Sequence, residues 1–179
     1  DAQFPLFANV ELVGKRLSTR PVSNGLELSK TWYDEEGKHI DLEWDTLKAK
    51  QGDLYTVLLE ISPTELHTSK DLLVTDLLPS GFEIEDSELG NPKLITSTGE
   101  LLDIDLTLGD APLYTQKLDD RFVAHFSGSW DKTDIAIVTY TVRAVYEGAM
   151  TIPDAHLELM YSPAINARSS VANAIIASK

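Results

Sequence analysis

Apolar and polar residues alternate along much of this chain, which is the pattern of β-strands with one buried face. Segment 40–45 is a clear example, because Ile40, Leu42 and Trp44 alternate there with three acids. Segment 135–145 is instead nearly unbroken in apolar and β-branched residues, which predicts a central strand buried on both faces. The predicted strands are 7–13, 26–33, 40–45, 54–61, 72–78, 82–85, 121–126, 135–145, 155–160 and 171–177.

Turn-forming residues separate these segments, for example at 34–37 and at Pro-Ser-Gly 79–81. Segment 86–119 is rich in Gly, Pro, Asp, Ser and Thr and is weakly patterned. We predict a long insertion or loop there, with a short helix or two small strands. The chain has no heptads, no internal repeat and no sustained helical periodicity. The predicted fold class is therefore all-β: an antiparallel β-sandwich with this insertion and at most one or two short helices.

The length of the chain suits one domain, and we predict a single domain over residues 1–179. A chain of this size buries roughly 70% of the surface that its unfolded form exposes, enough for a core without cross-links. No apolar run approaches the ~20 residues of a transmembrane helix, and no secretory signal segment is recognisable. The chain begins at Asp1 rather than Met, so we expect a processed or excised segment of a longer protein.

The chain is strongly acidic and contains no cysteine. A net charge of -14 disfavours nucleic acid, which requires clustered Lys and Arg, and also disfavours docking on anionic lipid. Without cysteine there is no disulfide, no thiolate metal ligand and no cysteine nucleophile. This absence leaves the compartment open, since many periplasmic domains also lack cysteine.

The residues that could carry chemistry do not form a catalytic or metal-binding pattern. The four histidines, which are His39, His67, His125 and His156, lack metal-ligand spacing. The serines of 127–129 lack the flanks of a nucleophile elbow. The acid clusters at 34–36 and 83–88 lack the ligand pattern of a calcium loop. The carboxylates of Asp103 and Asp105 resemble ordinary surface acids. We therefore expect no enzyme activity, no metal site and no cofactor.

Several aromatic residues could line a carbohydrate-binding platform. They are Trp32, Trp44, Trp130, Tyr33, Tyr55 and Tyr140. Each lies on or beside a predicted strand with apolar neighbours, so packing in the core or on a strand face is the simpler interpretation.

One segment near the C-terminus stands apart from this pattern. Met160 and Tyr161 directly precede Ser162 and Pro163, at the end of the predicted strand 155–160. Proline fixes its own φ and restricts the preceding residue, so Ser162-Pro163 should hold a defined bend rather than a continuing strand. A methionine and a tyrosine on such a bend either close the bottom of their own sandwich or anchor something outside it.

Four segments, the last of which contains this Met-Tyr pair, follow one another along the chain in the order of a known domain family. They are 76–85 (Asp-Leu-Leu-Pro-Ser-Gly-Phe-Glu-Ile-Glu), 119–124 (Asp-Asp-Arg-Phe-Val-Ala), 140–145 (Tyr-Thr-Val-Arg-Ala-Val), and Met-Tyr-Ser-Pro 160–163 through Ala-Arg-Ser 167–169. Together they resemble the C-terminal macroglobulin-like domain of bacterial α2-macroglobulins. The Gly-Asp strand at 52–57 followed by 75–82 also resembles repeated immunoglobulin-like domains of bacterial surface proteins. Either resemblance implies a β-sandwich, of the macroglobulin or fibronectin-III type in the first case.

Bacterial α2-macroglobulins are large periplasmic, usually lipid-anchored protease traps. A protease cuts a bait region, the molecule rearranges, and a Cys-Gln thioester in another domain captures the protease covalently. The resemblance implies that this domain packs on the thioester domain of the same parent chain and shields the thioester until the bait is cut. When the family's residues are matched to this chain by position, the resemblance implies that Met160 and Tyr161 shield the thioester and that Pro163 shapes the loop. The lack of cysteine agrees with a shielding module.

The same resemblance implies partners and a location. Target proteases would be met through the parent chain in the periplasm, and some family members are thought to work beside a penicillin-binding protein. The alternative is an immunoglobulin-like surface or adhesion module that binds a protein or glycan through its loops. The first hypothesis predicts an exposed Met160-Tyr161 loop and an upstream thioester domain, whereas the second predicts tandem copies. Family members with and without a thioester exist, and the sequence of this domain does not tell which kind its parent is.

Overall fold

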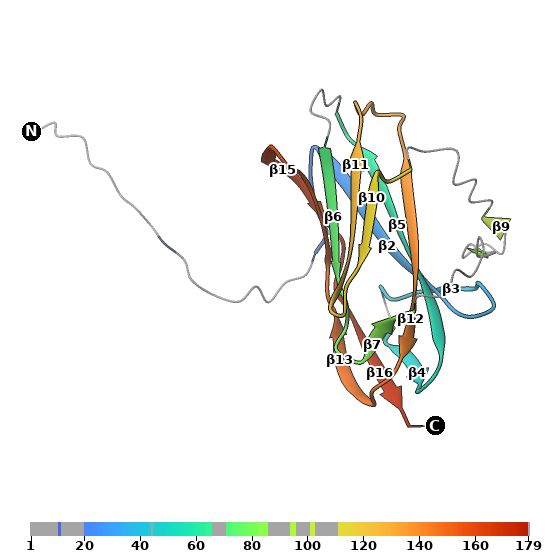
Figure 1. Ribbon diagram of the computed structural model, residues 1–179. Coiled ribbons are helices and arrows are strands. Elements are labelled where there is room, and N and C mark those ends of the chain that lie inside the picture. Colours follow the sequence, from blue (N-terminus) through green and yellow to red (C-terminus); the bar gives the residue numbers. More distant parts are fainter. Residues whose placement is uncertain are drawn as a thin grey trace, which may run out of the picture.

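Two β-sheets facing each other dominate the computed structural model, which describes residues 11, 20–43, 45–65, 71–85, 94–95, 101–102 and 111–178 (Figure 1). The six-stranded sheet has the spatial order β1 (Val22–Asn24), β15 (Ser162–Arg168), β14 (Ala155–Leu159), β6 (Asp71–Leu77), β11 (Arg121–Ser127) and β10 (Tyr114–Lys117). The five-stranded sheet has the order β3 (His39–Ile40), β2 (Leu26–Tyr33), β5 (Leu54–Pro63), β12 (Ala136–Ala144) and β7 (Phe82–Ile84). These ranges contain no helix, and so none that could cross a membrane.

Two small sheets complete the described part of the fold. One contains β13 (Gly148–Ile152), β16 (Ala172–Ala177) and β4 (Leu47–Lys50), and the other pairs β8 (Leu94–Ile95) with β9 (Leu101–Leu102). Within the described ranges every strand pair is antiparallel except one, because β16 runs parallel to β4. The predicted all-β antiparallel sandwich is thus confirmed, with one parallel pair at its lower end in Figure 1.

The core lies between the two large sheets and consists of alternate residues of their strands. In β6 and β11 every second side chain is buried, which is the alternation seen in the sequence. The largest fully buried side chains are Trp32, Trp130, Phe122 and Phe126. Phe122 and Tyr140 come from opposite sheets, and their rings stack with centroids 4.5 Å apart. Removing these faces from water is the main source of stability for such a fold.

The prediction that segment 135–145 is buried on both faces is wrong. Residues of β12 alternate between buried and half-buried, and Ile135 just before it is 45% exposed. The outer face is covered near Ile137 by a small apolar cluster, which contains Tyr33, Leu58 and Leu94. Elsewhere this face carries β-branched residues such as Thr139 and Thr141, which suit any pleated strand whether or not a second layer covers it.

Other elements differ from prediction in detail. Segment 86–119 contains the small strands β8 and β9, but β10 near its end is an exposed edge strand of the six-stranded sheet. Among the described residues of segment 40–45, only Ile40 belongs to a strand. Several predicted features lie outside the described residues, namely strand 7–13 apart from residue 11, Trp44, His67, Asp103 and Asp105.

Candidate functional site

A two-residue turn joins β14 to β15 and carries the methionine and tyrosine singled out in the sequence. Met160 is 44% exposed and Tyr161 is 77% exposed, and neither belongs to a buried apolar cluster. In Figure 1, β15 begins at the upper left, where it extends beyond the body of the sandwich. The two side chains therefore present an apolar surface to solvent instead of closing their own sandwich.

The β14 side of this turn is fixed to the neighbouring strand. Leu159, the last residue of β14, is buried and pairs with Leu72 of β6. The backbone N–H of Met160 then donates to the carbonyl oxygen of Asp71 at 2.9 Å. The Asp71 carboxylate lies 3.1 Å from His125 Nε2 on β11. Three strands of the sheet thus support the first half of the turn.

The β15 side of the turn is held by asparagine side chains. Leu159 pairs with Ser162 and Glu158 with Asn166, so residues 163–165 form a bulge without partners on β14. The Asn166 amide donates to the carbonyl oxygens of Pro163 and Ala164 at 2.9 and 3.2 Å. The Asn24 amide on β1 also donates to Ala164. These bonds replace the ladder contacts that the bulge removes.

The predicted bend at Ser162-Pro163 is displaced in the structure. The chain reverses at Met160 and Tyr161, whereas Ser162 and Pro163 already belong to β15. Proline lacks an N–H and is excluded from regular ladder positions, but it is tolerated at a bulge. Pro163 lies at such a position and is exposed. It therefore shapes the strand after the turn and not the turn itself.

Several histidines and acids of the described ranges make local contacts. His39 packs edge-on against Tyr33, and His156 Nε2 lies 4.0 Å from a Glu158 oxygen. Asp34 accepts a hydrogen bond from the backbone N–H of Lys38 across a tight turn. No group of three potential metal-ligating side chains occurs in this part of the chain.

Five of the six aromatic residues that could have formed a carbohydrate platform are described, and four of them lie in the core while Tyr33 lies in the small cluster on the outer face. Trp32, Trp130, Tyr33, Tyr55 and Tyr140 are all buried. The ring of Trp32 contacts Phe82 edge-on, with centroids 5.4 Å apart, and Trp130 packs similarly on Phe126. The simpler interpretation, packing in the core or on a strand face, therefore holds for these five residues.

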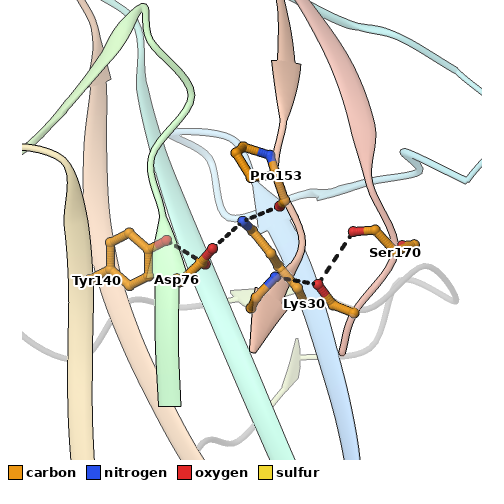
Figure 2. Close-up of polar contacts among 7 residues, drawn as sticks. Lys30, Asp76, Tyr140, Pro153 and Ser170 are labelled. Carbon is orange, nitrogen blue, oxygen red and sulfur yellow. Dashed lines mark hydrogen bonds and ion pairs between the residues drawn. The ribbon is translucent and has the colours of Figure 1, made fainter. Parts of the chain in front are cut away.

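A charged network inside the sandwich was not predicted (Figure 2). Lys30 Nζ on β2 donates to Asp76 Oδ1 on β6 at 2.6 Å, and the two side chains are 3% and 0% exposed. The Tyr140 hydroxyl on β12 donates to the other carboxyl oxygen, Asp76 Oδ2, at 2.7 Å. Lys30 Nζ also donates to the carbonyl oxygen of Pro153 at 3.2 Å. The network connects the two large sheets through the core.

Burial dominates the electrostatics of this network. It raises the pKa of Asp76, while the charge and hydrogen bond of Lys30 and the bond from Tyr140 act in the opposite direction. Burial beside the carboxyl also raises the pKa of Tyr140 well above its usual range. A sequence signal existed, because Lys30 precedes buried Trp32 by two residues and Asp76 follows buried Val74 by two. Charged residues at such inward positions are rarely buried unless they are paired.

The fold and the turn define the class of protein: an all-β sandwich domain that presents a supported apolar turn. The family model described as the Bacterial Alpha-2-macroglobulin MG10 domain matches residues 25–164. The chain belongs to this family, so the resemblance found in the sequence is confirmed.

Relatives and solved structures agree with this assignment. The alpha-2-macroglobulin of Xylella fastidiosa (strain Temecula1 / ATCC 700964) is 32% identical over 177 residues, covering 96% of this chain and 10% of that protein. The alpha-2-macroglobulin of Escherichia coli (strain K12) is 30% identical over 176 residues, with the same coverage. The chain thus spans about a tenth of the curated relatives that it matches.

Two crystal structures extend the comparison to three dimensions. Native alpha-2-macroglobulin from Escherichia coli, spanning domain MG7 to the C-terminus, matches with a TM-score of 0.72 and 30% identity, over 91% of this chain and 25% of that one. Salmonella alpha-2-macroglobulin reacted with methylamine matches with a TM-score of 0.66 and 26% identity, over 89% of this chain and 10% of that one.

Proposed function

We propose that this chain is the non-catalytic domain of a protease-inhibiting α2-macroglobulin that packs on the thioester domain of its parent. In this role it shields the thioester from water and amines until a protease cuts the bait region. Met160 and Tyr161 supply the shield, and the bulge at Pro163 sets the path of the strand behind them. The observation that carries the proposal is the exposure of these two apolar side chains on a supported turn.

The chemistry of a thioester supports a dry, removable cover of this kind. Its acyl-sulfur bond survives only where water and amines are excluded. An aromatic ring together with a polarizable thioether covers apolar area compactly. Since the cover must also separate when the trap closes, its residues should lie on the surface and not in the core of their own domain. The 77% exposure of Tyr161 meets that requirement.

The composition of the chain supports a division of labour within the parent. Its 179 residues contain no cysteine, so a Cys-Gln thioester would have to lie in another domain. Target proteases would then be met by the parent and not by this domain alone. The proposal places the parent in the periplasm, anchored to the cell envelope by lipid, where a penicillin-binding protein is a further possible neighbour.

Methylamine uptake by the full-length parent tests the proposal. Methylamine is a small amine that reacts with an accessible thioester, and the Salmonella relative has been solved after reaction with it. We expect the double variant Met160→Ala/Tyr161→Ala to take up methylamine faster than wild type. Tyr146→Ala is the matched control, because Tyr146 is also an exposed tyrosine, at 61%, but lies in a different loop.

Each outcome has a distinct meaning. Faster uptake in the double variant alone, with unchanged thermal unfolding of this domain, supports the shield. Equal uptake in all three proteins would refute it and assign these residues a structural role. No uptake in any of them, even after bait cleavage, would indicate a family member without a thioester and would refute the shielding role.

A further inference from the structure

We propose that the side chains of Lys30 and Asp76 become joined by an intramolecular amide bond that forms within the folded domain without an added reagent. The reacting groups are already in contact, because Lys30 Nζ lies 2.6 Å from Asp76 Oδ1. Groups held in contact react with effective concentrations on the order of 10⁵ M or higher when their orientation is suitable. The bond would link β2 in one sheet to β6 in the other.

The surroundings of the pair match the product better than the reactants. An amide has one N–H and one carbonyl oxygen, and both would have partners in place (Figure 2). The N–H would donate to Pro153, whose carbonyl oxygen is 3.2 Å from Nζ, and Oδ2 would accept from the Tyr140 hydroxyl at 2.7 Å. A lysine ammonium has three N–H groups, but within the described ranges only two oxygen acceptors contact it.

Burial also favours the neutral product. The side chains of Lys30 and Asp76 are 3% and 0% exposed, so an ion pair here has lost almost all its hydration. Removing two charges from water is unfavourable, and attraction between them offsets this cost only with complete hydrogen bonding. Lys30 Nζ also lies over the Trp32 ring, 5.8 Å from its centroid. An amide carries no charge and avoids this cost.

The reaction balances with the groups present. A proton moves from Lys30 Nζ to Asp76 Oδ1, which leaves a neutral amine beside a carboxylic acid. Nζ then attacks Cγ of Asp76, while the Tyr140 hydroxyl stabilises the charge that develops on Oδ2. A second proton passes from nitrogen to Oδ1, the Cγ–Oδ1 bond breaks, and one water departs. No electron is gained or lost overall, and Tyr140 keeps its proton.

The electrostatic surroundings of these groups are compatible with this route. Burial raises the pKa of Asp76, which favours the acid over the less electrophilic carboxylate. The pKa of Tyr140 is raised as well, so its hydroxyl remains a hydrogen-bond donor. Asp154 is a further charged group acting on Asp76, and it too raises the pKa of that carboxyl.

Peptide mass spectrometry of the folded full-length parent tests the proposal. The protein is denatured and digested with a protease that does not cleave at lysine. We expect the peptides containing Lys30 and Asp76 to be recovered as one branched species, lighter than their sum by one water. Recovery of both peptides as separate, unmodified species from long-stored protein would overturn the proposal, because denaturation breaks an ion pair but not an amide.

Two conservative variants separate chemistry from folding. Tyr140→Phe removes the hydroxyl that contacts Oδ2 but keeps the ring stacked on Phe122, so we expect a folded protein in which the branched species forms much more slowly. Tyr55→Phe is the matched control, because Tyr55 is also buried but its hydroxyl contacts Asp53. The control should be linked as fully as wild type. A complete link at wild-type rate in Tyr140→Phe would overturn the role of that hydroxyl.

Discussion

The backbone N–H of Met160 is bound to the carbonyl oxygen of Asp71, 2.9 Å away, although the two residues are far apart in the sequence. The bond attaches the exposed turn to the first residue of β6, a strand in the interior of the six-stranded sheet. An exposed side chain on a free loop samples many directions, whereas one on a supported turn is held in place. The position of Met160 is therefore set by the core of the sheet.

Removal of the exposed tyrosine should leave the domain stable. Because Tyr161 is 77% exposed, Tyr161→Ala should change the free energy of unfolding by less than about 1 kcal/mol. By contrast, Trp130→Ala removes a fully buried ring and should cost about 3–5 kcal/mol. Urea denaturation of both variants measures the difference. A loss for Tyr161→Ala close to that for Trp130→Ala would mean that the ring packs into the fold.

The bulge in β15 should depend on the amide of Asn166. Asn166→Ala removes the donor to the Pro163 and Ala164 carbonyl oxygens and should cost about 1 kcal/mol. Hydrogen exchange should become faster at the β14–β15 turn, including the Met160 amide, and remain unchanged in β5 and β12. Asn173→Ala is a suitable control, since Asn173 is an exposed asparagine of β16. Unchanged exchange at the turn would show that Asn24 or the ladder suffices.

Stability should fall in strongly alkaline solution. Burial, followed by the nearby Asp53 carboxylate, raises the pKa of Tyr55 well above its ordinary value of 10.0, and burial also raises the pKa of Tyr33 and of Tyr140. With a raised folded-state pKa, the contribution is fully present below pH 10 and is lost as pH rises through the folded pKa. Denaturation midpoints should therefore drop above about pH 10. Tyr55→Phe should flatten this slope, and an unaltered slope would contradict the assignment.

A charge introduced on the inner face of β12 should unfold the protein, whereas one on the outer face should not. Val138 is 6% exposed, so Val138→Asp places an unpaired carboxylate in the core, at a cost beyond the stability of most domains. Thr139, the next residue, is half-buried on the opposite face, and Thr139→Asp should remain folded. Circular dichroism distinguishes the two cases. A folded Val138→Asp variant would mean that the side chain of residue 138 does not point into the core.

Local pattern predicted the long strands well. The predicted segment 26–33 coincides with β2, and 54–61 lies within β5, because alternation and β-branched residues report directly on a pleated surface. The strands β10 and β13 were missed because few of their residues face the core, and β4 was missed because its alternation extends over only four residues. β15 was missed because Pro163 normally ends a strand, and only the bulge makes its position permissible.

The candidate site at the β14–β15 turn was predictable only where local sequence pattern revealed it. Met160 and Tyr161 could be singled out as a locally unusual pair, and they do occupy an exposed turn. The bonds to Asp71 and Asn24 connect distant parts of the chain, and no local pattern encodes them. The contact of Lys30 with Asp76 depends on how two sheets pack face to face. The inward positions of Lys30 in β2 and Asp76 in β6 indicated that each charge needed a partner, but they did not identify that partner.

The parallel pairing of β16 with β4 has a consequence for biosynthesis. Ala174 of β16 pairs with Leu47 of β4, and Ala177 pairs with Lys50. Because β4 comes much earlier in the sequence, it leaves the ribosome long before β16 has been synthesised. β13 also depends on β16, which lies between the two. The three-stranded sheet of β13, β16 and β4 can therefore assemble only after translation has passed residue 177. Until then β4 and β13 both lack the strand that pairs with them.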